Sequence, residues 1–196
     1  MGNGSVTKER ILHTALQIFA EHGYEGARMD KIASEVGINK ASLYFHFKSK
    51  EDIFRALYHD IFSKYRNWQK ELTGETSGLP SKQRLTAIYE KYLDYNWNNA
   101  EMDFWNRIYY LPPAAMREEI LAETTEIKNS FVFQLSLIME EGIRKKELRP
   151  LGAVSMAKSY YYVLTCIDLS SALLSKEQSL KDMEECFRIF WEAVRA

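Results

Sequence analysis

Residues Lys40–His46 place several hydrogen-bonding side chains on the solvent side of a short predicted helix. Lys40, Ser42, Tyr44 and His46 together offer an ammonium group, two hydroxyl groups and an imidazole. Groups of this kind contact phosphate oxygens and the acceptors on base edges in DNA. A helix this short is not stable alone. We therefore expect it to be held by neighbouring elements and to dock onto a partner.

The flanking sequence predicts the elements that hold this helix. A helix near Asp30–Val36 precedes it, and Gly37-Ile38-Asn39 separates the two, which is typical of a helix-turn-helix. Asn39 fits the N-cap of the second helix. Apolar residues spaced to fill the interior are Leu16, Phe19, Ile32, Val36, Ile38, Leu43 and Phe47. Such a unit usually inserts its second helix into the major groove of DNA.

The segment from Arg28 to Ile53, RMDKIASEVGINKASLYFHFKSKEDI, strongly resembles the TetR family of transcriptional repressors. The resemblance covers about residues 7–60 and includes Gly23-Tyr24, Ile32-Ala33, Gly37-Ile38, Leu43-Tyr44, Phe47 and Lys50-Glu51. It implies a sequence-specific transcriptional regulator that binds a palindromic double-stranded DNA operator as a homodimer. In this family a small-molecule inducer usually relieves repression.

The resemblance also implies roles for individual residues. The side chains expected to face the major groove are Lys40, Ala41, Ser42 and Tyr44. Those expected to contact phosphates are Arg28, Asn39, Tyr44, His46 and Lys50, with the start of the next helix near Lys48–Lys50. Alternatively, the Tyr44 ring only packs against the small domain and His46 only caps the surface. Many relatives carry Gly and Thr in place of Ala41 and Ser42, so their preferred bases do not transfer.

Helical periodicity continues through the chain without an alternating strand pattern, so we expect an all-α protein with about nine helices. The expected helices lie near residues 7–23, 30–36, 40–46, 49–72, 82–98, 101–111, 114–146, 152–174 and 180–194. Thr73–Pro80 has the composition of a linker. We expect a DNA-binding domain at residues 5–65, with the helix-turn-helix at 28–47, and a ligand-binding and dimerisation domain at 66–196.

Aromatic residues concentrate between positions 89 and 110, where eight of 22 residues are aromatic compared with 13% of the chain. Aromatic clefts between helices are typical small-molecule sites, although the same residues would also suit a core or a dimer surface. The ligand-binding candidates are Tyr65, Trp68, Tyr92, Trp97, Phe104, Trp105, Tyr109 and Tyr161. Acidic residues outnumber basic ones in this window, which favours a lipophilic inducer and, among such compounds, a cationic aromatic one.

The last two predicted helices have broad apolar faces. The resemblance implies that they pair with their copies in a four-helix dimer interface. The candidate interface residues are Leu164, Leu173, Phe187 and Phe190. The two-fold symmetry of such a dimer would match operator half-sites about 34–36 Å apart, or a multiple of that distance.

Charge and composition limit the remaining hypotheses. The net charge of −1 argues against a strongly basic protein, but residues 26–50 carry five basic and two acidic side chains, a local charge of +3. Two cysteines and an N-terminus without an apolar leader segment predict a cytoplasmic protein without membrane contact. No catalytic, cofactor or metal motif occurs, so we expect a protein that is not an enzyme and that has neither a cofactor nor a metal site. The main alternative is a helix-turn-helix protein that acts mainly through protein–protein contacts.

Overall fold

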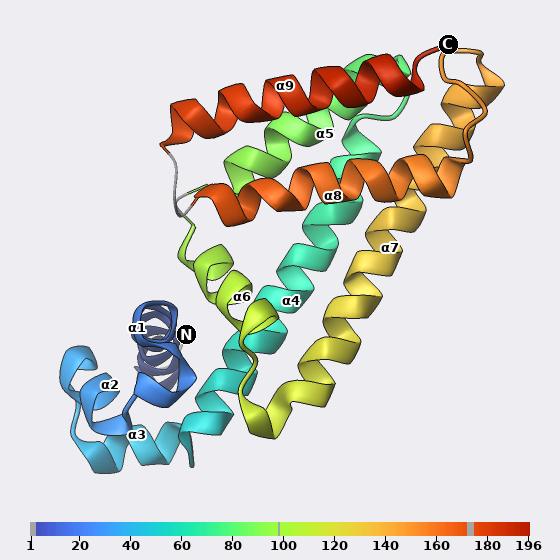
Figure 1. The fold of residues 1–196 in the computed structure, drawn as a ribbon. Coiled ribbons are helices and arrows are strands. Elements are labelled where there is room, and N and C mark those ends of the chain that lie inside the picture. The colour runs from blue at the N-terminus through green and yellow to red at the C-terminus, as the bar shows by residue number, and fades with distance from the viewer. Residues whose placement is uncertain (1–2, 98, 172–174) are drawn as a thin grey trace. The chain divides into compact units, whose positions relative to one another are not determined.

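The computed structural model describes residues 3–97, 99–171 and 175–196, and its regular elements in these residues are helices (Figure 1). They are α1 (Asn3–Gly26), α2 (Met29–Val36), α3 (Lys40–His46), α4 (Lys50–Glu75), α5 (Ser81–Asn96), α6 (Ala100–Tyr110), the 3-10 turn η1 (Ala114–Met116), α7 (Arg117–Arg144), α8 (Ala153–Ser171) and α9 (Lys176–Val194). The expected all-α class is confirmed. Among the described helices, none is both long and apolar enough to cross a membrane.

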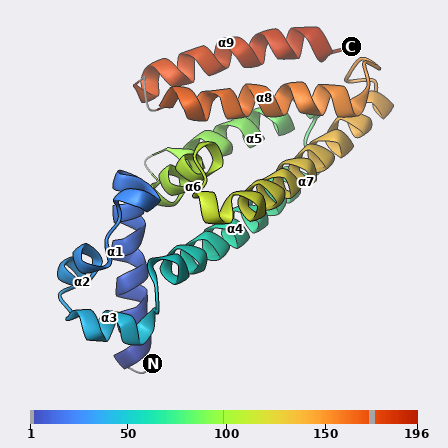
Figure 2. The ribbon, with the colours of Figure 1, turned by 60° about the horizontal axis from the view of Figure 1, so that its bottom comes forward.

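The helices form two compact units. The first consists of the described residues up to 65 together with 99–122, and the second consists of residues 66–97 and the described residues from 123 onward. The helices α4 and α7 contribute to both units. In the first unit α6 packs against α1 (Figure 2). Residues 99–122, which we expected in the C-terminal domain, therefore belong to the same compact unit as α1, α2 and α3.

Capping interactions explain where the short helices begin and end. Gly37 ends α2 in the left-handed conformation, with φ of 76°, and Asn39 caps α3 by accepting a hydrogen bond from the Ser42 amide at 2.8 Å. Ser49 caps α4, because its hydroxyl accepts a hydrogen bond from the Asp52 amide at 3.1 Å. These three predicted boundaries are confirmed.

Other predicted boundaries are wrong. The first helix begins at Asn3 rather than Thr7, and it continues beyond a kink at Gly23 to Gly26. Helix α4 extends to Glu75, so the expected linker is partly helical. Helix α9 begins four residues early, because Ser175 accepts a hydrogen bond from the Gln178 amide at 3.2 Å and caps the helix there.

Aromatic side chains build the core of the first unit around α1, α4 and α6. Phe19, Phe54 and Phe104 are each at most 1% exposed. The Phe54 ring centroid lies 5.3 Å from that of Phe19 and 5.1 Å from that of Phe104. Because rings at these separations bury large apolar areas, the cluster ties α1 and α4 to α6.

The second unit has its own core, in which α8 and α9 run side by side (Figure 1). Tyr160 on α8 is fully buried, and its hydroxyl donates a hydrogen bond to the Leu85 carbonyl on α5 at 2.5 Å. The ring centroids of Tyr160 and Phe190 on α9 lie 5.5 Å apart. A buried tyrosine hydroxyl needs such a partner, so this bond fixes α8 against α5.

Replacing Gly142 by alanine is expected to destabilise the second unit by about 1–3 kcal/mol. A Cβ atom at this position of α7 would lie 2.5 Å from the Ser81 hydroxyl and 2.6 Å from a Leu148 methyl carbon. Gly74→Ala on α4 is the matched control, because a Cβ there meets nothing within 4 Å and should add about 0.5–1 kcal/mol of stability. Urea denaturation measures the free energy of unfolding of both variants. If both variants lost stability, or both gained it, the result would contradict this packing.

Candidate nucleic-acid interface

The structure divides α3 into a buried face and an outward face. Leu43 and Phe47, at 0% and 5% exposure, anchor the buried face. Ala41 and Tyr44 are exposed on the other side of the helix. Ser42 is half-buried, and its backbone amide is already bonded to Asn39. The Asn39 side chain thus has a capping role that leaves its amide NH2 group for other contacts.

Lys40 lies at the start of α3 and forms an ion pair with Asp30 on α2. The Lys40 ammonium and the Asp30 carboxylate are 2.9 Å apart, and both side chains are well exposed. The hydrogen bond between them raises the pKa of Lys40 and lowers the pKa of Asp30. An exposed pair of this kind contributes little to stability, so Lys40 can exchange Asp30 for a phosphate or a base at low cost.

The two lysines after α3 are placed differently. Lys50 donates to the Tyr24 carbonyl at 2.6 Å, and its ammonium lies 4.2 Å from the centroid of the Tyr24 ring. This lysine therefore links the start of α4 to the end of α1 inside the first unit. Lys48 is more exposed, and its ammonium lies 3.4 Å from the Tyr44 carbonyl. Lys48 is the better placed of the two for a phosphate contact.

The remaining predicted DNA contacts lie at the edges of this surface. Arg28 is exposed at the N-cap of α2 and makes no side-chain capping bond there. His46 is half-buried at the end of α3, and its ring centroid lies 5.4 Å from that of Phe45. Phe45 is 78% exposed. Phe45 was not among the predicted DNA contacts, although its position one turn after Ala41 could have indicated the same face.

The eight ligand-binding candidates divide equally between the two units. In the first unit, Tyr65 and Trp105 are buried with their ring centroids 5.3 Å apart, Phe104 is in the core, and Tyr109 is 37% exposed. In the second unit, Tyr92 and Tyr161 are buried, and the ring of each lies near that of Phe131. Trp97 is half-buried at the end of α5, and Trp68 stacks on Tyr95 with 3.9 Å between ring centroids.

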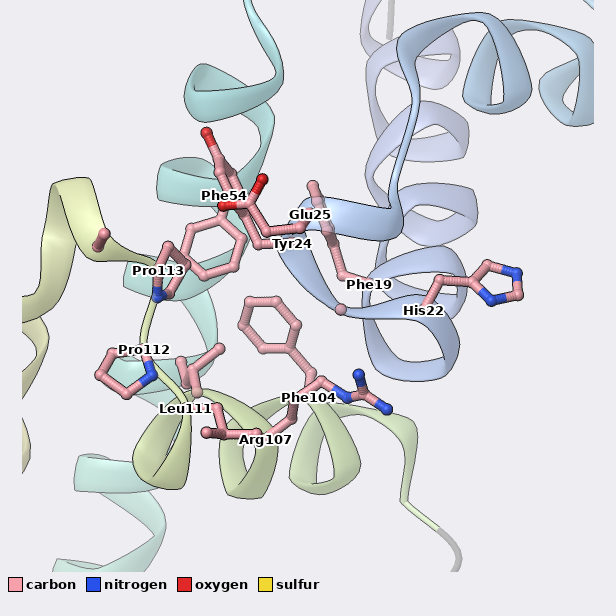
Figure 3. A pocket seen from close by; sticks show the side chains of 13 residues that line it. Phe19, His22, Tyr24, Glu25, Phe54, Phe104, Arg107, Leu111, Pro112 and Pro113 are labelled. Atoms are coloured by element: carbon pink, nitrogen blue, oxygen red, sulfur yellow. The ribbon is translucent and has the colours of Figure 1, made fainter.

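Each unit contains a pocket that one of these candidates lines. The pocket that Phe104 lines in the first unit has a volume of about 260 Å³ and lies among side chains of α1, α4 and α6, with Arg107 also in its wall (Figure 3). The pocket of the second unit has a volume of about 240 Å³. Trp68 and Tyr95 line it together with the charged side chains of Glu71, Glu75, Lys91 and Asp94. Aromatic rings beside an excess of carboxylates are chemically suited to a cation.

Three of the four candidate dimer residues lie inside the chain's own core. Leu164, Phe187 and Phe190 are 0%, 9% and 8% exposed, which leaves them little surface for a partner. Leu173 lies outside the described residues. Among the residues of α8 and α9 whose side chains are described, the exposed large apolar ones are Val154, Tyr162, Leu180 and Ile189.

Together, the capped helices α2 and α3 form a helix-turn-helix, a unit whose second helix enters the major groove in DNA-binding proteins. Residues 11–57 match the family model described as bacterial regulatory proteins, tetR family. The N-terminal segment of the chain therefore matches the TetR family, in agreement with the resemblance seen in its sequence.

Individual relatives agree with this assignment. The uncharacterized HTH-type transcriptional regulator YerO of Bacillus subtilis is 32% identical over 63% of this chain and 40% of its own length. The biofilm operon icaADBC HTH-type negative transcriptional regulator IcaR of Staphylococcus epidermidis is 40% identical over 30% of this chain and 31% of its own length. The matches thus span less than half of either relative. A transcriptional regulator from Saccharomonospora viridis, solved in complex with choline, has the same fold, with a TM-score of 0.73, 18% identity and coverage of 98% and 99% of the two chains.

Proposed function

We propose that this protein is a sequence-specific transcriptional repressor that binds a palindromic operator as a homodimer and releases it when a small molecule binds. The observation that carries the proposal is α3, a capped seven-residue helix whose buried face is anchored by Leu43 and whose exposed face carries Lys40 and Tyr44. A helix of this length gains its stability from packing, and its free face suits the major groove. IcaR, which matches the N-terminal segment, is a negative regulator, and the matched relatives are transcriptional regulators rather than enzymes.

An electrophoretic mobility shift with the promoter DNA beside the protein's own gene tests this proposal. We expect a retarded complex that unrelated DNA of the same length does not compete away. Its affinity should fall steeply with salt, because each phosphate contact releases a counterion. A protein that shifts neither this promoter nor other DNA would instead favour the alternative of a helix-turn-helix protein acting through protein–protein contacts.

The dimer is proposed to form through the outer faces of α8 and α9. Ile189 is 60% exposed on α9, and Tyr162 is 51% exposed on α8. The buried residues Leu164, Phe187 and Phe190 would then shape these helices from within rather than contact the partner directly.

Replacing Ile189 by aspartate is expected to convert the dimer to a monomer, because a carboxylate would be buried without a partner in an apolar interface. Light scattering during size-exclusion chromatography at micromolar concentration measures the change. Phe133→Asp is the matched control, since Phe133 is 62% exposed on α7 and should leave the dimer intact. A monomeric wild-type protein would refute the dimer.

The ligand is proposed to be lipophilic, with a cationic aromatic compound as the best fit to the pocket around Trp68. The carboxylates that line this pocket outnumber its single lysine, Lys91, which is paired with Glu75. The choline complex of the Saccharomonospora viridis protein is a further reason to include cations in a screen. Release of DNA requires that the ligand bind better to a conformer that fits the operator poorly. Helix α4 contributes residues to both units, so we propose that it transmits this change.

In a thermal-shift screen, lipophilic cations are expected to raise the melting temperature of the wild-type protein and to weaken its operator complex. A ligand at a hundred times its dissociation constant stabilises the folded state by about 2.7 kcal/mol, which such a screen detects readily. Trp68→Ala should abolish the shift, whereas Tyr109→Ala, in the first unit, should retain it. A screen in which only anionic acyl compounds raise the melting temperature would contradict the proposed ligand class.

A further inference from the structure

The centre of the outward face of α3 is apolar rather than polar. At 100° per residue, Ala41 and Phe45 both point nearly opposite to the buried Leu43, one helical turn apart. Ala41 is exposed, and Phe45 is 78% exposed, more than any other large apolar side chain among the described residues. A single exposed phenylalanine is ordinary on a protein surface, but this one lies on the face proposed to enter the major groove.

Polar groups lie on the two sides of this apolar stripe. Tyr44 and Lys40 lie on one side, with the Lys40 ammonium 6.0 Å from the centroid of the Tyr44 ring. Ser42 and His46 lie on the other side. The His46 ring meets the Phe45 ring at 5.4 Å between centroids and an angle of 85°, an edge-to-face contact that supports the position of Phe45. Hydrogen-bonding groups are therefore available only beside Phe45, not on it.

Resting on the proposed function, we infer that Phe45 is a specificity-determining residue that reads the C5-methyl group of a thymine in each operator half-site. The thymine methyl is the apolar group that base pairs present in the major groove, and phenylalanine and alanine are side chains that contact it. A phenylalanine ring cannot distinguish hydrogen-bond donors from acceptors, so its contribution to specificity has to come from this apolar contact. Ala41 extends the same surface by one turn.

Removal of the methyl group by deoxyuridine substitution tests this inference, because base pairing is unchanged. The duplex is first selected from random DNA by the wild-type protein, and each thymine is then replaced in turn, symmetrically in both half-sites. One buried methyl group corresponds to about a fourfold change in affinity, or about fifteenfold for two half-sites. At one thymine per half-site, wild-type protein should lose about this factor, whereas Phe45→Ala should lose less than about twofold.

Phe133→Ala is the matched control, because it removes a second exposed phenylalanine, at 62% exposure, from α7. It should retain the wild-type response at every position. Circular dichroism should show that Phe45→Ala is folded, as expected for an exposed side chain. If its affinity is too low to titrate, Phe45→Leu allows the same comparison and should show a smaller loss than the wild type.

Two results would overturn the inference while the proposed function stands. One is a wild-type protein that responds to no deoxyuridine substitution, and the other is a Phe45 variant with the full wild-type response. Loss of the response in Ala41→Gly alone would assign the methyl contact to Ala41 and also overturn the role of Phe45. Failure to select any duplex would overturn both the inference and the proposed function.

Discussion

The double variant Lys40→Ala/Tyr44→Ala is expected to lose at least about a hundredfold in operator affinity while it keeps its helical content, melting temperature and dimeric state. Good side-chain contacts to bases are each worth about 1–3 kcal/mol, and a dimer makes them in two half-sites. The slope of log affinity against log salt should fall by about two, one phosphate contact per half-site, if Lys40 also neutralises a phosphate.

Stability should change little in this variant, because both side chains are exposed. The pair of Lys40 with Asp30 lies on the surface, where such pairs contribute little. Lys181→Ala/Tyr110→Ala is the matched control, since Lys181 forms an exposed ion pair with Glu177 and Tyr110 is 49% exposed. Fluorescence anisotropy with a labelled operator compares the two. Equal affinity losses in both double variants would show that the Lys40 variant acts through general charge rather than through α3.

Replacing Phe104 by alanine is expected to destabilise the first unit by about 3–5 kcal/mol. Phe104 is fully buried, and its ring centroid lies 5.1 Å from that of Phe54 and 6.2 Å from that of Phe19. The substitution would remove the α6 member of a cluster that also holds α1 and α4, and would enlarge the neighbouring pocket. Operator binding should weaken as a consequence, because α1, which packs against α2, contributes Phe19 to the same cluster.

Urea denaturation followed by far-ultraviolet circular dichroism measures this loss. Tyr109→Ala on the same helix is the control, since Tyr109 is 37% exposed and its replacement should change stability by less than about 0.5 kcal/mol. If Phe104→Ala were as stable as Tyr109→Ala, Phe104 would be free to serve mainly as a ligand-binding residue, as its sequence pattern first suggested.

The sequence predicted the helix-turn-helix well because its signals are local. Gly37, Asn39 and Ser49 each determine a helix end through their own backbone conformation or side chain, and all three do so in the structure. Leu43 and Phe47 follow directly from helical spacing. The start of α1 and the end of α4 were missed because neither end carries a strong capping signal.

The roles of the aromatic residues could not be predicted in this way, because periodicity does not distinguish a cavity wall from a core. Tyr92 and Tyr161 have the same residue type and helical setting as a pocket residue, yet both are packed against Phe131 in the core. Periodicity also does not distinguish a dimer surface from a core. Phe187 and Phe190 lie on the face of α9 that is buried inside the chain. The exposure of Phe45 was not predicted, because an apolar residue in a helix is expected to be buried.

Selection of binding sites from a pool of random duplex DNA tests the central claim most directly. Wild-type protein is expected to enrich an inverted repeat whose half-site centres are separated by about 34–36 Å or a multiple of it, as a two-fold symmetric dimer requires. The Lys40→Ala/Tyr44→Ala variant should enrich no motif under the same conditions. If the wild-type protein, at low salt and without added ligand, recovered only random sequences, the result would contradict sequence-specific binding by a two-fold symmetric dimer.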